Sequence, residues 1–325
     1  MLRRLLCLSV TALVLAPVAS ADGGGPSPGV DQGWDGVTNS RLPVRYVTAT
    51  TGTNTVLEVI RKRDGRVLNF MSLTGLWGIP AVTYNGQAGG LSIDGRTLVL
   101  QEATTPHGPL RSQTSFLVID TKRWRPSQPI ILQGDFSFDA LSPQARTLYL
   151  IHHVSATNVT HYVVRAYDLA EARLLPGRIA DRTQRGWVMR GFPVARATSG
   201  DGRWVYTLYR NDGGYPFVHA LDTVQGKAHC IGLPWQGSQD NLNLRLSLRD
   251  SGRRLVIGWQ DGASSPFGSI DTRTYRFVRA AYGTGGGGGA SFPWWAILIA
   301  VAVPVGALVA RILLRRSKTA EVQPT

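Results

Sequence analysis

Cysteine and lysine are scarce in this chain. Cys7 and Cys230 are the two cysteines, and Cys7 lies in a hydrophobic N-terminal segment, so a chain that has lost this segment cannot form an internal disulfide. Cys230 lies in the apolar stretch KAHCIGL, where a buried, small apolar side chain is the expected role; a nucleophile or a link between two chains is the alternative. Lysine occurs at only four positions, so arginine supplies nearly all the basic charge, a bias typical of GC-rich bacterial genomes.

The sequence also lacks the short motifs of several enzyme classes. It has no HExxH, no paired CxxC and no glycine loop between a strand and a helix, which excludes the common zinc-protease, zinc-ribbon and nucleotide-binding arrangements. No long stretch before residue 292 has helical periodicity, so no residues are left to build an α/β domain around a serine nucleophile. The usual frameworks for hydrolysis and nucleotide chemistry are therefore missing.

The N-terminus has the layout of a secretory signal. Arg3 and Arg4 precede an apolar run that ends in small residues, which predicts a signal peptide over residues 1–21 with cleavage after Ala21. An uncleaved membrane anchor is the alternative. Residues 22–39 are expected to form a flexible N-terminal segment. An exported, extracytoplasmic protein follows from this prediction.

A second hydrophobic segment lies near the C-terminus. Residues 292–314 include a long uncharged run with Trp294 and Trp295 at its start, which predicts one transmembrane helix with an aromatic belt. The arginines of the 315–325 tail mark that side of the membrane as cytoplasmic. The glycine-rich linker 283–291 predicts a flexible tether. We therefore expect a single-pass type I protein of the cell membrane, with its bulk outside.

One short phrase recurs along the central part of the chain. It reads LSIDGRTLVL, LSPQARTLYL, TSGDGRWVYTL and LSLRDSGRRLVI, with shared arginines at Arg96, Arg146, Arg203 and Arg253. Each phrase is followed by a second strand that ends in an aspartate, at Asp120, Asp168, Asp222 and Asp271. A reduced copy, TVLEVIRKRDGRVLNF, precedes them. Asp-Gly and Ser-Gly turns between β-rich runs predict hairpins, and a period near 50 residues is typical of propeller blades.

This order of repeated motifs resembles that of secreted bacterial β-propellers of the TolB-like and Trp-Asp-repeat-like kind, whose blades carry S-x-D-G-x-x-L/V-Y followed by V-x-x-x-D. The resemblance implies an all-β, propeller ectodomain over residues 40–282. No subfamily is assigned, because the repeat copies within residues 40–282 lack the Gly-His and Trp-Asp signatures of the eukaryotic-type repeat. Five copies favour five blades, with six or seven as alternatives. Ring closure is expected to pair residues 41–48 with the last blade, since closure removes exposed sheet edges.

The repeated aspartates are expected to have structural roles. Asp94, Asp201 and Asp250 are predicted to shape hairpin turns, and the second-strand aspartates to accept hydrogen bonds from their own backbone. A catalytic centre needs one constellation of side chains, whereas these residues recur in every copy. We therefore assign no catalytic, cofactor-binding or metal-binding residue.

An enzymatic alternative depends on the acids that remain after the repeat is removed. These are Glu58, Glu102, Asp135, Asp139, Glu171, Asp181, Asp212, Asp240 and Asp261. A glycosidase-like propeller needs two carboxylates in its central channel, and Glu102 is the best single candidate. His153 and His161 are close enough in sequence to share a metal across a hairpin, although a polar hairpin with exposed imidazoles explains the same pattern.

Charge favours a binding role over catalysis. Residues 23–291 contain 29 basic and 19 acidic side chains, which give the outer part of the chain a charge near +10. Such a domain is attracted to anionic polymers or headgroups, whereas nucleic acid is not an expected partner of an exported chain. A basic and aromatic cluster around GWVMRGF, with Arg182, Arg185 and Arg190, is a candidate contact surface or a plain solvated loop.

The sequence thus predicts a non-catalytic, cell-surface binding module that engages a protein or an anionic envelope polymer. The first alternative is a propeller hydrolase with a channel site near Glu102. The second is a structural component of a membrane complex. No cofactor is expected.

Overall fold

The computed structural model describes residues 36–103, 110–155, 158, 161–183, 189–210, 215–234, 243–260 and 266–280. Their regular structure is almost all antiparallel β-strand, as predicted, apart from the short 3-10 turn η2 (Asp250–Gly252). Within these ranges no helix is long and apolar enough to cross a membrane. The predicted signal peptide (1–21), linker (283–291), membrane helix (292–314) and tail (315–325) lie outside the described residues.

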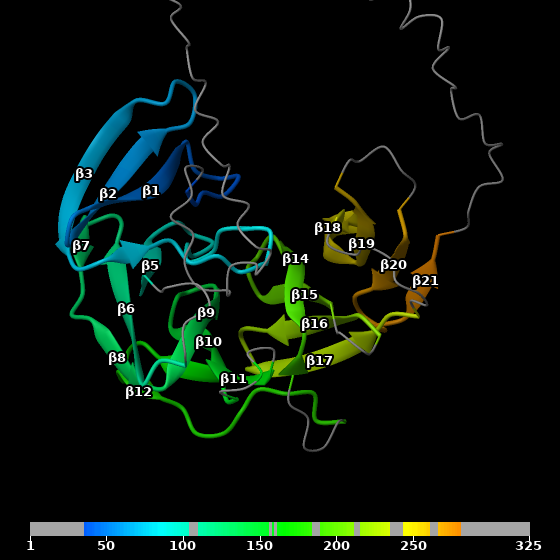
Figure 1. The fold of residues 1–325 in the computed structure, drawn as a ribbon. Helices are drawn as coiled ribbons and strands as arrows, with labels where there is room; N and C mark the ends of the chain where they lie inside the picture. The colour runs from blue at the N-terminus through cyan, green and yellow to red at the C-terminus, as the bar shows by residue number, and fades with distance from the viewer. Residues whose placement is uncertain are drawn as a thin grey trace, which may run out of the picture. The chain divides into compact units, whose positions relative to one another are not determined.

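The described strands form sheets that follow one another along the chain (Figure 1). The first sheet contains β1 (Val44–Thr51), β2 (Asn54–Arg61) and β3 (Val67–Thr74) in that order. The second contains β4 (Trp77–Gly78), β5 (Thr97–Glu102), β6 (Gln113–Asp120) and β7 (Arg125–Pro126), with β8 (Ile130–Gln133) also paired to β6. Chain order and sheet order agree along each series of neighbouring strands.

The three later sheets repeat this arrangement. The third contains β9 (Asp135–Leu141), β10 (Thr147–His153), β11 (His161–Asp168) and β12 (Arg173–Leu174), with β13 (Met189–Arg190) also paired to β11. The fourth contains β14 (Phe192–Thr198), β15 (Trp204–Arg210), β16 (Phe217–Asp222) and β17 (Lys227–Gly232). The fifth contains β18 (Leu244–Arg249), β19 (Arg254–Trp259), β20 (Gly268–Asp271) and β21 (Phe277–Arg279).

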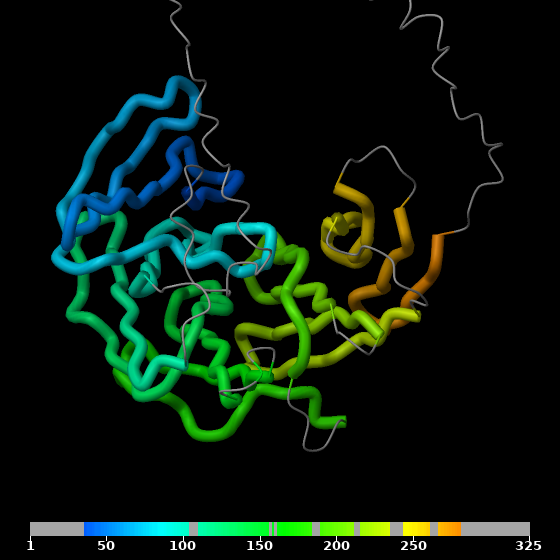
Figure 2. Tube along the Cα trace, in the orientation of Figure 1, coloured from blue at the N-terminus to red at the C-terminus, as the bar shows by residue number. Residues whose placement is uncertain are grey.

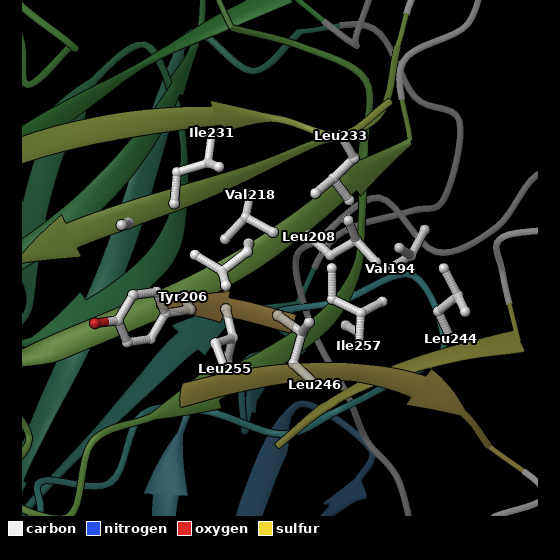
Figure 3. Close-up of a cluster of buried hydrophobic side chains, with 13 residues drawn as sticks. Val194, Tyr206, Leu208, Val218, Ile231, Leu233, Leu244, Leu246, Leu255 and Ile257 are labelled. Carbon is white, nitrogen blue, oxygen red and sulfur yellow. The ribbon is translucent and has the colours of Figure 1, made fainter. Parts of the chain in front are cut away.

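Hydrophobic side chains join each sheet to the next. Four buried clusters occupy the four interfaces between successive sheets, from the first with the second to the fourth with the fifth. Figure 3 shows the last of these, where Val194 and Leu208 of the fourth sheet meet Leu246 and Ile257 of the fifth. Burying one such side chain stabilises a protein by about 1.5–3 kcal/mol. Among the described residues, no cluster joins the fifth sheet to the first.

The predicted roles of the second-strand aspartates are confirmed by their hydrogen bonds. A carboxylate oxygen of Asp120 accepts the backbone N–H groups of Lys122 and Arg123, at 3.0 and 2.8 Å. The corresponding bonds recur at the other three aspartates, Asp168, Asp222 and Asp271. The backbone donors at Arg123 and Lys122 outweigh burial and lower the pKa of Asp120. These carboxylates are ionised, and they stabilise their turns by accepting backbone N–H groups.

In three of the four copies the aspartate is followed by a threonine that ties the second strand to the first turn of the same copy. Thr121 Oγ1 donates to the carbonyl oxygen of Gly95 at 2.6 Å, and Thr223 and Thr272 make the same bond to the glycines of their own copies. The hydroxyl therefore closes the hairpin pair as a unit. The repeated D-T dipeptide thus has a folding function.

The expected pairing of residues 41–48 with the last sheet is wrong. Strand β1 pairs along its whole length with β2, from Val44 with Arg61 to Thr51 with Asn54. On its other side, Tyr46 forms an isolated bridge with Val37. Both edges of β1 are therefore used within the first sheet, because the short turn after residue 37 brings its own chain to the nearest free edge.

The segment between β4 and β5 runs inward before it joins its own sheet. It lies beside β14, two sheets further along the chain, where Tyr84 N donates to the carbonyl oxygen of Pro193 at 2.6 Å. Figure 2 shows this cyan segment near the start of β14. The second sheet begins at Trp77, before this segment, and continues after it with β5. This inward excursion brings residues of several sheets around one cavity.

Candidate functional site

A cavity of about 420 Å³ lies where the first strands of the sheets converge. Residues from all five sheets or the segments before them line it, within 37–39, 82–93, 138–143, 196–205 and 246–248. Apolar side chains, glycine backbone and a few hydroxyl and amide groups make up most of the lining. Asp139 and Arg196 are the only charged residues among the described residues that line it.

Asp139 and Arg196 form a buried ion pair. Asp139 lies in β9 and is 2% exposed, while Arg196 lies in β14 and is 8% exposed. The Arg196 guanidinium donates through Nη2 to Asp139 Oδ1 and through Nη1 to the Asp139 carbonyl oxygen. Its Nε donates to Thr207 Oγ1 at 3.0 Å. A buried charge needs such a partner, so each residue fixes the other and joins the third sheet to the fourth.

Two glutamines join inner strands to the preceding part of the chain. Gln87 accepts the Arg196 N–H at 3.2 Å and donates to the Arg196 carbonyl oxygen at 3.4 Å. Gln101 accepts the Phe138 N–H at 3.0 Å and donates to the Phe136 carbonyl oxygen at 3.3 Å. Each side-chain amide thus makes the pair of hydrogen bonds, one accepted and one donated, that the backbone of a neighbouring strand would make at this edge. The amides near the cavity are already engaged within the fold.

A group of buried polar rings lies behind the ion pair. His219 is 2% exposed, and its ring lies 6.4 Å from that of Tyr209, centroid to centroid. Burial lowers the pKa of His219 to about 4, so the imidazole is neutral. Cys230, the cross-strand partner of His219, is a buried free thiol whose pKa is raised by burial. This bears out the expected role of Cys230 as a small buried side chain.

Glu102, the sequence candidate for a channel acid, lies outside the cavity lining. It occupies the exposed end of β5, in register with Trp77. Of the acids left over from the repeat that the structure describes, Asp139 alone lines the cavity, and its carboxylate is paired with Arg196. A glycosidase-type pair of acids is therefore not present in the described lining. Asp212, Asp240 and Asp261 lie outside the described residues.

The two histidines considered for a metal are placed differently from each other. His153 is 7% exposed and lies 3.4 Å from Ser137 Oγ, whereas His161 is half-buried with its Nε2 3.4 Å from the Asn158 amide. The expectation of exposed imidazoles is therefore wrong for His153, because β10 turns that side chain into the third sheet's core. The part of the chain that the structure describes holds no group of three metal-ligating side chains.

Five turns, one for each sheet, contain or directly follow residues that line the cavity. We call them the mouth turns: residues 38–43, 93–96, 143–146, 199–203 and 249–254. Asn39 Nδ2 donates to the Ile93 carbonyl oxygen at 3.3 Å, and Arg41 Nη2 donates to that of Gly200 at 2.7 Å. These bonds bring turns of different sheets together. The predicted turn aspartates lie here, and Asp94 and Asp201 each accept a bond from the serine two residues earlier.

The basic cluster around GWVMRGF is only partly described. Arg182 and Arg190 are exposed, and Met189 is buried in the interface between the third and fourth sheets. Arg185 and residues 186–188 of the motif lie outside the described residues. Neither Arg182 nor Arg190 lines the cavity.

Sequence reasoning missed the Asp139–Arg196 pair. The signal was present, because β9 and β14 are apolar strands that each contain one charged residue where the side chains are buried. A lone charge inside such a strand requires a partner. The partner is 57 residues away, so the local pattern does not name it.

Comparisons with known proteins find distant similarities among solved structures. No family model matches the chain, and no curated protein matches it. Among solved structures, hydrazine synthase of Kuenenia stuttgartiensis is 16% identical over 70% of this chain and 73% of its own, with a TM-score of 0.39. TolB from Acinetobacter baumannii is 13% identical over 74% and 58%, with a TM-score of 0.35. The Dos1 propeller is 10% identical over 73% and 55%, with a TM-score of 0.41.

Proposed function

We propose that this protein is a non-catalytic binding module, built from five blade-like sheets and held outside the cytoplasmic membrane by its C-terminal segment. Its binding surface is formed by the mouth turns and the cavity that they border. The partner is a protein or an anionic polymer of the cell envelope. The structural role in a membrane complex remains the second use of the same surface.

The observation that carries this proposal is that the charged side chains of the cavity and Gln87 already have partners within the fold. The cavity's one described carboxylate is held by Arg196, and Gln87 is bound to the backbone of Arg196. General acid catalysis needs a carboxyl group that can take up and release a proton beside a second reacting group. A carboxylate fixed by a guanidinium is poorly suited to that task. Because these polar groups of the cavity are engaged within the fold, we assign recognition to the mouth turns at its rim.

Proximity labelling in intact cells tests the proposal. The labelling enzyme is fused to residue 22 of the full-length chain, so that it follows the exported part of the protein. The expected result is labelling of extracytoplasmic proteins or of enzymes that make an envelope polymer. Labelling of cytosolic proteins alone contradicts both the binding role and the predicted topology.

A second experiment addresses catalysis. The full-length chain is incubated with a panel of glycosides, beside the Asp139→Asn variant. No turnover by either protein is expected. Turnover that is lost in Asp139→Asn, in a variant that still folds, replaces the binding proposal with the hydrolase alternative.

A further inference from the structure

The mouth turns carry an excess of positive charge. Together they contain seven arginines and three aspartates. Arg41, Arg96, Arg146 and Arg253 are exposed and belong to four different turns. The excess therefore lies around the cavity rather than on one side of it.

Folding does not require the guanidinium groups of the repeat arginines. Arg96 serves its turn through its backbone, which donates to Asp94 Oδ1 at 3.0 Å and accepts the Thr121 N–H at 2.9 Å. In the first sheet Pro43 takes the same place and accepts the N–H of Lys62. The turn thus tolerates a residue with no charge.

Three of these exposed guanidinium groups, those of Arg96, Arg146 and Arg253, make no hydrogen bond or ion pair with the residues that the structure describes. Besides the backbone N–H groups that Asp168 accepts, the charge of Arg146 also helps to lower the pKa of Asp168. Arg203 differs, because its Nη2 donates to Asp222 Oδ2 at 2.7 Å. Arg196, inside the cavity, is also paired. Attraction for an anion is therefore located at the rim.

We propose that the mouth turns bind a linear polymer that carries a phosphate group on successive units and lies across the cavity mouth. This inference rests on the proposed binding function and names its partner. Arginine matches phosphate oxygens with two parallel N–H donors. Packed sheets lie about 10 Å apart, so turns of neighbouring sheets present their arginines too far apart for one small anion to bridge them. Successive units of one polymer reach them in turn.

A membrane surface fits this rim less well than a polymer. The strongly exposed large apolar side chains of the described residues, such as Phe70, Val224 and Val278, all lie outside the mouth turns. Peripheral membrane proteins usually combine basic residues with apolar side chains that enter the lipid. Among the described residues, the mouth turns have basic side chains but no exposed large apolar side chain.

The test measures binding of long-chain inorganic polyphosphate to the full-length chain in neutral-lipid nanodiscs. The test variant combines Arg96→Gln, Arg146→Gln and Arg253→Gln. The matched control combines Arg66→Gln, Arg125→Gln and Arg178→Gln, which removes the same charge from exposed positions outside the mouth turns and outside the basic cluster around GWVMRGF. An unchanged Tm for both variants shows that they fold.

We expect the test variant to bind polyphosphate roughly tenfold to a hundredfold more weakly than the unmodified chain, and the control to bind nearly as well. Raising the salt concentration weakens binding, and the slope of log affinity against log salt falls by about one for each arginine removed. Equal losses in both variants overturn the inference, since net charge then explains binding. Equally tight binding of polyglutamate overturns the phosphate assignment.

Two further outcomes separate this inference from the proposed function. Binding to anionic phosphatidylglycerol vesicles without binding to polyphosphate overturns the inference and identifies a membrane surface. If polyphosphate does not bind while proximity labelling still reports an outer protein partner, the polymer inference fails and the binding function stands.

Discussion

At the scale of single residues, five equivalent turn positions share one unusual backbone conformation. They lie four residues after each second-strand aspartate, or after Arg61 in the first copy, and are Gly65, Trp124, Ala172, Gly226 and Tyr275, with φ between +48° and +71°. Glycine occupies this left-handed region freely, whereas a residue with a Cβ is strained there by roughly 1–2 kcal/mol. Three of the five copies therefore hold a strained residue.

Ala172→Gly is expected to stabilise the protein by about 0.5–1 kcal/mol, because Ala172 is exposed and loses only its Cβ. Gly65→Ala is the matched reverse change, since nothing lies within 4 Å of the added Cβ, and it should destabilise by a similar amount. Urea unfolding of the full-length chain in detergent measures both. Opposite signs are required; a loss of stability in both variants contradicts the conformational explanation.

His219 should make stability depend on pH in a defined window. Its folded-state pKa of about 4 lies below the ordinary value of 6.5, so the unfolded chain binds a proton between these values that the folded chain does not. Stability therefore falls as the pH falls from 6.5 to 4, by about 3 kcal/mol in total, and is unaffected by this group above 6.5.

His219→Gln removes this titration and should flatten the unfolding free energy over pH 4–6.5. His152→Gln is the control, because burial also lowers the pKa of His152 but the residue is less deeply buried. Urea unfolding at a series of pH values distinguishes the two. A pH profile that His219→Gln leaves unchanged contradicts the assignment.

At the scale of strands, the buried ion pair joins β9 to β14. Arg196→Met should destabilise the protein by about 3–5 kcal/mol, because Asp139 then remains as an unpaired buried charge. The double variant Arg196→Met with Asp139→Leu should recover most of this loss, since two apolar side chains replace the pair. A double-mutant cycle of unfolding free energies measures the coupling. Additive losses contradict a direct interaction between the two residues.

The hairpins could be predicted from the sequence because their causes are local. Asp-Gly turns and strand patterning act within a few residues, and the predicted aspartate roles are confirmed at Asp120 and its equivalents. The inward course of the segment before β5 was not predictable, because it depends on Gln87 meeting Arg196, 109 residues later. The cavity depends on the same long-range contacts, so its charged residues were named only as spare acids or not at all.

At the scale of the whole described structure, the first and fifth sheets each have one packed face. Phe70 of β3 is 67% exposed and Val278 of β21 is 55% exposed. Phe70→Ser and Val278→Ser should therefore each change the free energy of unfolding by less than about 0.5 kcal/mol, in contrast to Leu57→Ala in the first interface, at about 2–5 kcal/mol.

Thermal and urea unfolding of the full-length chain measure these three variants. A loss of several kcal/mol at Phe70 or Val278 contradicts the exposure of these faces and indicates that another part of the chain, or a second protein, covers them. The Leu57→Ala variant shows that the assay detects the loss of an interface.

The four hydrophobic interfaces also determine which sheets separate first when the protein unfolds locally. In a linear series of sheets the cohesion is a sum of nearest-neighbour terms, so the second, third and fourth sheets are each held from two sides and the terminal sheets from one. Fluctuations that separate a terminal sheet cost one interface, whereas release of an inner sheet costs two. Amide protons in the strands of the three inner sheets should consequently exchange with solvent more slowly than those of the first and fifth sheets.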